Sequence, residues 1–79
     1  MYPTPAQIRA ARALLGISQE ELAELARVSK RTIANMESGD GRPIRATKDA
    51  VFLALLDAGI EFTYDEVRDA HGVRLVPGA

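Results

Sequence analysis

The residues with the greatest capacity for chemistry lie between Ser29 and Ser38. Ile33 and Met36 recur there at helical spacing, so the segment is expected to be a helix with one buried side. Two cations and an amide occupy its other side: Lys30, Arg31 and Asn35. Arg and Lys can donate to O6 and N7 of guanine, and Asn can pair with N6 and N7 of adenine. The segment is therefore a candidate for base recognition in a DNA major groove.

The charge of the chain is compatible with DNA binding only because the charged residues are unevenly distributed. The net charge is −1. Residues 27–48 hold six cations and two acids, which gives +4, whereas residues 49–79 hold six acids and two cations, which gives −4. Local charge steers nucleic acid more than total charge does. A DNA surface is thus expected in the middle of the chain, and the acidic last third would suit a basic protein.

Other chemistries have little support in the sequence. The absence of cysteine excludes a disulfide framework, a thiolate metal site and a catalytic thiol. His71 is the one histidine and has no acidic or cysteine motif beside it, so no metal site is expected. The serines are better explained as helix caps than as nucleophiles, because no general base accompanies them. We expect a non-enzymatic protein without a cofactor.

Four helices are expected to position the basic segment. Their capping residues and stop signals place them from Thr4 to about Leu15, from Ser18 to about Ala26, from Ser29 to Ser38 and from Thr47 to Ala58. Gly16 and Gly59 would end the first and the last, and Asp40 to Pro43 has the composition of a loop. The inward positions are expected to be Ile8, Ala11, Leu14, Leu15, Leu22, Leu25, Ala26, Ile33, Met36, Val51, Ala54, Leu55 and Ala58.

The connection between the second and third helices is short. Only Arg27, Val28 and Ser29 separate them, so the two helices should cross steeply, with Val28 filling the core beneath the turn. Such a crossing leaves the outward side of the third helix free. The basic residues would then stand on an accessible helix in a helix-turn-helix.

After Gly59 the apolar spacing changes from helical to alternating. Ile60 to Tyr64 and Val73 to Leu75 are expected to be two short strands, so residues 1–59 are interpreted as a helical unit and residues 60–79 as a β-hairpin extension. An isolated hairpin is marginal in water. It should either pack on the fourth helix or form a dimer interface, whose candidate residues are Ile60, Phe62, Tyr64, Val73 and Leu75.

The region from Ile8 to about Ala58 resembles the phage-repressor and Cro type of helix-turn-helix, the XRE family. The matching residues are Gly16-Ile17-Ser18-Gln19-Glu20-Glu21-Leu22-Ala23, Val28-Ser29, Thr32-Ile33 and Met36-Glu37-Ser38-Gly39. The resemblance implies a mainly α, compact bundle of four or five helices of lambda-repressor-like type. It also implies that the third helix enters the major groove, and that the protein regulates transcription as a dimer.

Carried over position by position, the resemblance assigns DNA-binding roles. The implied contacts are Gln19, Ser29, Lys30, Arg31, Thr32, Asn35, Ser38, Arg42 and Arg45. Gln19 would also brace the third helix, and Arg12 with Glu37 matches an internal salt bridge of the family. Arg27 departs from the family pattern, because glycine is frequent there and a non-glycine residue with positive φ is strained. The turn could therefore be shifted, and Arg27 could add a phosphate contact.

The resulting expectation is a cytoplasmic, prokaryotic or phage repressor that binds an inverted-repeat operator as a homodimer. The chain has no apolar run long enough for a membrane span, and its start lacks the features of a signal peptide. Two alternatives stay open. One is an antitoxin, which would bind its operator and would also bind a toxin through the C-terminal region. The other is a protein-binding adaptor with the same fold.

Overall fold

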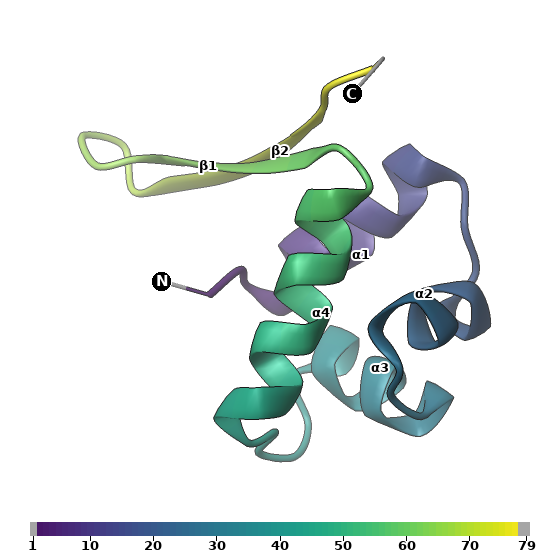
Figure 1. Cartoon of the computed structure of the whole chain (residues 1–79). Coiled ribbons are helices and arrows are strands. Elements are labelled where there is room, and N and C mark those ends of the chain that lie inside the picture. The colour runs from purple at the N-terminus through teal and green to yellow at the C-terminus, as the bar shows by residue number, and fades with distance from the viewer. Residues whose placement is uncertain (1, 78–79) are drawn as a thin grey trace.

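Four helices precede an antiparallel β-hairpin in the chain (Figure 1). This computed structural model describes residues 2–77. The elements are α1 (Pro5–Leu15), α2 (Gln19–Ala26), α3 (Lys30–Ser38), α4 (Arg45–Asp57), β1 (Ile60–Asp65) and β2 (Ala70–Leu75). The described residues thus contain four helices, the lower of the two numbers expected, and the predicted hairpin is confirmed. In this part of the chain, no helix is both long and apolar enough to cross a membrane.

Side-chain caps begin the first three helices, as the sequence predicts. Thr4 and Ser18 each accept from the backbone N–H three residues later, while Gln7 and Glu21 return the contact and complete two capping boxes. Ser29 caps α3 in the same way through the N–H of Thr32, at 3.1 Å. These contacts satisfy donors that a helix start leaves without partners.

A single hydrophobic core joins the helices and the first strand. Its fully buried large side chains are Leu22, Ile33, Val51, Leu55 and Ile60. Val28 packs against this core from the α2–α3 turn, as expected. Because Ile60 belongs to the same cluster as the helical residues, the hairpin is anchored at its base.

The hairpin lies across α1 and the C-terminal end of α4, and its loop end projects beyond the helices (Figure 1). Gln7, which is 94% removed from solvent, fastens it to α1. Its Nε2 donates to the carbonyls of Gly72, at 2.8 Å, and Thr63, at 3.3 Å, which oppose each other in the ladder. The hairpin therefore packs on the helices, but its larger contact is with α1 and not with α4, on which it was expected to pack.

Two leucines expected in the core are exposed instead. Leu14 is 46% and Leu25 57% accessible. On α2 the buried residues are Leu22, Ala23 and Ala26, so the side of the helix that contains Ala23, and not the side that contains Leu25, faces the core. Helical spacing alone fits either choice over two turns. Ala54 and Ala58 are only half-buried, whereas the remaining inward positions of α4, Val51 and Leu55, are buried as expected.

The predicted start of the fourth helix was wrong. α4 begins at Arg45, and the residue in the capping position is Ile44, which has no capping hydrogen bond. Thr47 therefore lies inside the first turn rather than before it. Pro43 closes the preceding loop, and the chain becomes helical two residues later. The favourable capping chemistry of Thr47 did not determine the boundary.

The strands are longer than predicted. β1 extends to Asp65, and β2 begins at Ala70, so His71 and Gly72 belong to the sheet. Ile60 pairs with Leu75 and Phe62 with Val73. Among the five residues considered for a dimer interface, Ile60 is only 1% accessible within the protomer, and Phe62 and Val73 pack partly against its core. Tyr64 and Leu75 are the exposed members.

Candidate nucleic-acid interface

The outward side of α3 presents the residues that the sequence singled out. Lys30, Arg31 and Asn35 are exposed, whereas Ile33 and Met36 are buried on the opposite side. Thr32 is half-buried, and its hydroxyl lies 2.9 Å from that of Ser29. The helix therefore offers two cations and an amide to a partner while its apolar residues fix it in the core.

The two cations of α3 differ in their surroundings. Lys30 Nζ lies 3.3 Å from a carboxylate oxygen of Glu20, and both side chains are more than half exposed. Such a surface ion pair stabilises a protein by about 0–1 kcal/mol, so a phosphate or base can compete for the ammonium group. Arg31 forms no ion pair within residues 2–77. Its guanidinium is the more readily available group for a bidentate contact.

The turn between α2 and α3 has the tight form expected of it. Arg27 closes α2 with φ 58° and ψ 44°, a left-handed conformation that usually favours glycine. Its N–H donates to the carbonyl of Glu24 at 3.2 Å, and the N–H of Val28 donates to that of Ala23 at 3.0 Å. Arginine thus occupies the conformation for which the family often has glycine, and the side chain is exposed.

Glu37 joins three helices behind the outward side of α3. Its carboxylate accepts from Arg12 Nε of α1 at 2.8 Å and from Gln19 Nε2 of α2 at 3.1 Å. Arg12 Nη2 adds a second contact at 3.2 Å, which makes the ion pair bidentate. The predicted salt bridge is confirmed, and Gln19 contacts α3 through Glu37, as expected of a bracing residue.

The pKa of the Glu37 carboxyl is held below its usual value although the residue is only 3% accessible. Burial alone would raise the pKa of its carboxyl, but hydrogen bonds from Arg12 and Gln19, together with the charges of Arg12 and Arg9, outweigh burial and lower it. Charge-assisted, bidentate contacts of this kind are among the stronger ones in proteins. They hold α3 in a fixed orientation relative to α1 and α2.

Arg9 has a role that the sequence did not suggest. Its Nη1 donates to the backbone carbonyl of Glu37, near the C-terminal end of α3. A cation at this end of a helix is favourable both for the free carbonyl and for the helix dipole. No motif marks Arg9, because its partner is 28 residues away and is a backbone group.

The end of α3 and the following loop complete the candidate surface. Ser38 donates to the carbonyl of Asn35 and lies 3.1 Å from a carboxylate oxygen of Asp40. Arg42 and Arg45 are exposed, one in the loop and one at the start of α4. Both therefore extend the basic surface of α3 along the chain, whereas Asp40 is an acid within it.

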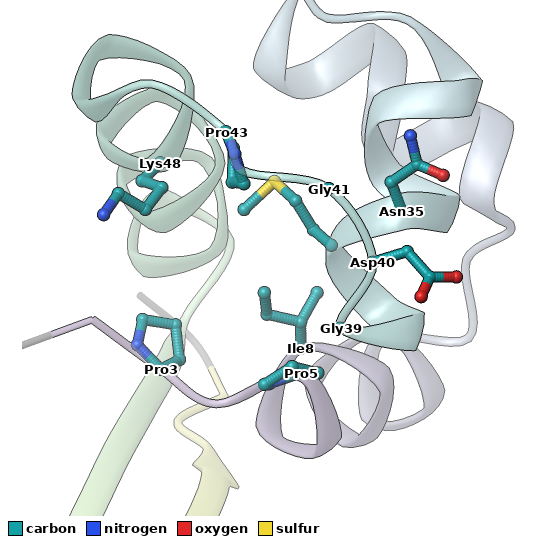
Figure 2. A pocket seen from close by; sticks show the side chains of 10 residues that line it. Pro3, Pro5, Ile8, Asn35, Gly39, Asp40, Gly41, Pro43 and Lys48 are labelled. Carbon is teal, nitrogen blue, oxygen red and sulfur yellow. The ribbon is translucent and has the colours of Figure 1, made fainter.

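A small hollow separates α1, the end of α3 and the start of α4 (Figure 2). Its volume of about 190 Å³ is below the roughly 300 Å³ at which small-molecule sites usually begin. Pro3, Pro5 and Ile8 line one side, while the amide of Asn35 and the carboxylate of Asp40 point away from its centre (Figure 2). Asn35 is therefore directed toward the outer surface rather than into the hollow.

The acidic residues of the hairpin lie apart from α3. The hairpin and α3 occupy opposite ends of the molecule in Figure 1. The exposed acids of the hairpin and its loop include Glu61, Glu66 and Asp69, and two of the cations there are already paired, Arg68 with Asp65 and Arg74 with Glu61. The acids of the hairpin are therefore separated from α3 in space, whereas Asp49 and Asp57, the other acids of the last third, lie on α4.

Comparison with known proteins gives one family. The helix-turn-helix family HTH_3 matches residues 8–47, just over half of the chain, from α1 to the first turn of α4. A comparison with curated proteins finds no match. The matched region contains the capped α2 and α3, the tight turn between them and the Arg12–Glu37 pair. The chain therefore belongs to the XRE, or lambda-repressor-like, helix-turn-helix family of DNA-binding regulators.

Proposed function

We propose that this protein is a transcriptional repressor that binds an inverted-repeat operator as a homodimer. Each α3 enters the major groove and reads a half-site of about 3–5 base pairs, and the half-site centres lie about 34–36 Å apart, one turn of the duplex. With one recognition helix per protomer, a second copy doubles the number of bases read.

The observation that supports this proposal is the exposed side of α3. Its cations and amide are available to a partner, and the Glu37 contacts with α1 and α2 fix the direction in which they point. A preorganised helix loses little conformational freedom on binding, so a smaller entropic cost is subtracted from the free energy of its contacts.

The individual residues have distinct proposed roles. Arg31 and Lys30 read guanine, and Asn35 reads adenine or contacts the backbone. The residues proposed to position the protein on the phosphates and sugars are Gln19, Ser29, Thr32, Ser38, Arg42 and Arg45. Phosphate contacts set register and orientation, whereas base contacts set specificity.

The dimer is proposed to form through the hairpin. Tyr64 and Leu75 are exposed there, with Phe62 and Val73 beside them, while Ile60 serves the protomer's own core. Both edges of the two-stranded sheet are unpaired within residues 2–77. A monomer in sedimentation experiments at tens of micromolar protein would remove this part of the proposal.

The decisive experiment is selection of bound sequences from a random double-stranded DNA pool. The wild type is compared with a Lys30→Ala, Arg31→Ala double variant and with a control that removes equal charge from the hairpin, Arg68→Ala, Arg74→Ala. We expect a palindromic consensus from the wild type and the control but not from the α3 variant. Each lost bidentate pair should cost about 1–3 kcal/mol of discrimination.

A protein partner is the second candidate, favoured by the exposed acidic surface of the hairpin and its loop. This surface would repel DNA and suits a basic protein, as in an antitoxin or an adaptor. If well-folded wild type enriches no sequence, the proposed DNA recognition is wrong and the adaptor function is favoured. Enrichment of an operator together with co-purification of a small toxic protein would support the antitoxin.

A further inference from the structure

Ile44 is an exception among the residues that begin the helices. The residues before α1, α2 and α3 are Thr4, Ser18 and Ser29, and each accepts a capping hydrogen bond. Ile44 occupies the same position before α4, with φ −70° and ψ 161°, and cannot cap. Serine, threonine, aspartate and asparagine are strongly preferred at such positions, and isoleucine is among the poorest. The backbone at Ile44 is suited to a capping residue that the sequence does not supply.

Burial does not compensate for the missing cap. The side chain of Ile44 is 70% exposed. Single exposed apolar residues are common on protein surfaces and need no explanation by themselves. Ile44 differs because its exposure comes in addition to a lost cap, so neither the local helix nor the core gains from isoleucine at this position.

The surroundings of Ile44 point to a nucleic-acid partner. Ile44 lines a hollow of about 280 Å³ together with Thr32 and Asn35 of α3. Arg42 and Arg45, both exposed, flank it in the chain, and Arg42 lines the same hollow. An apolar side chain between cations matches a DNA strand, in which apolar sugar surface lies between charged phosphates.

We infer that Ile44 is a DNA-contacting residue that packs against apolar C–H surface of one strand, while Arg42 and Arg45 neutralise the phosphates on either side. This inference rests on the proposed function of α3. The surface contacted belongs either to a deoxyribose, which is the same for every base, or to the C5-methyl group of a thymine, which contributes to sequence readout. The contact extends the α3 footprint toward α4.

The test compares two substitutions at this position, of which the first is expected to raise stability and to weaken binding. Ile44→Ser supplies the missing cap, so the melting temperature of the free protein should rise by several degrees. The same variant should bind the selected operator about tenfold more weakly, because the apolar contact is lost. Ile44→Leu keeps an apolar side chain and should bind within about twofold of wild type. Val67→Ser, at a 95% exposed position in the hairpin loop, is the matched control.

Operators in which each thymine is replaced in turn by deoxyuridine separate the two sources of apolar surface. If one replacement weakens the wild type but not Ile44→Ser, the contact is with that thymine methyl. If none does so, it is with a deoxyribose. Equal operator affinity of wild type and Ile44→Ser would overturn the inference while leaving recognition by α3 intact. If the wild type binds no operator at all, the proposed function and the Ile44 contact fail together.

Discussion

At the scale of single residues, Glu37 is the clearest link between folding and the candidate interface. Its buried carboxylate accepts from Arg12 and Gln19, and its backbone carbonyl accepts from Arg9. One residue of α3 is therefore held by three side chains from two other helices. The exposed side of α3 cannot rotate without breaking these contacts, several of which are charge-assisted.

The stability of the protein should fall in acid partly because of Glu37. Its pKa is lower in the folded protein than its ordinary value of 4.5. The stabilisation is therefore fully present above pH 4.5 and is lost as the pH falls through the lower, folded value. We expect Glu37→Gln to lower the free energy of unfolding by about 1–3 kcal/mol at pH 7 and to flatten the decline in acid. Urea denaturation from pH 7 to pH 3 measures both effects.

The control for this pH dependence is Glu66→Gln, which changes an exposed carboxylate of the hairpin loop. It should leave both the free energy at pH 7 and the acid slope close to wild type. If Glu37→Gln declined in acid as steeply as wild type, the pH dependence would have to originate in other carboxylates.

At the scale of elements, the α2–α3 turn depends on an unfavourable backbone conformation. Arg27 has φ 58°, in the left-handed region that glycine adopts without steric cost. The hydrogen bonds of Arg27 and Val28 to α2, and the packing of Val28 on the core, hold the turn in place. Arg27 thus keeps this left-handed conformation although it is not glycine, so its steric cost remains in the folded protein.

Arg27→Gly should therefore stabilise the protein. Relief of the left-handed strain, offset in part by the flexibility of glycine in the unfolded chain, should contribute about 0.5–1 kcal/mol. The melting temperature should rise by about 4–8 °C per kcal/mol for a domain of this size. Arg27→Ala removes the same cation without relieving φ, and should show no such rise in a thermal melt. Equal gains from both variants would mean that charge, not backbone strain, is the cause.

Operator affinity of the same two variants examines the possible phosphate contact of Arg27. A similar loss of affinity in both would assign it to the missing guanidinium. A loss in Arg27→Gly alone would instead point to a looser turn.

At the scale of the whole molecule, charge is distributed unevenly between the candidate interface and the hairpin. The cations of the candidate interface lie on α3 and the residues that follow it, with the exposed acids of α2 and Asp40 near them, whereas the hairpin at the other end in Figure 1 carries more acids than cations. The charges are therefore unevenly distributed over the molecule despite its net charge of −1. Such a distribution should orient the protein as it approaches DNA.

Salt dependence should reveal how many phosphates the basic end neutralises. The logarithm of the operator binding constant falls with the logarithm of salt concentration by about 0.9 per phosphate contact. Arg42→Gln, Arg45→Gln should therefore reduce the slope by about 1.8 per protomer, as measured by fluorescence anisotropy from low to physiological salt. Arg68→Gln, Arg74→Gln on the hairpin should leave the slope unchanged. An unchanged slope in the first variant would show that these two arginines do not contact phosphates.

The sequence by itself determined the starts of the first three helices and the side of α3 that faces outward. Capping residues act within three positions of themselves, so Thr4, Ser18 and Ser29 reveal the first three helix starts directly. Likewise, Ile33 and Met36 define the buried side of α3, and the remaining positions must point away from it. The Arg12–Glu37 pair was also expected, although only through the resemblance to the family.

The tertiary structure decided features whose partners are far apart in the chain. Gln7 looks like a capping residue in the sequence, but the fold also brings it onto the carbonyls of Thr63 and Gly72. Arg9 donates to a backbone carbonyl of α3. On α2, Ala23 is buried where Leu25 was expected to be, and Leu25 is exposed. None of these outcomes follows from local spacing, because each depends on which surface of one element meets another after the helices and the hairpin have packed.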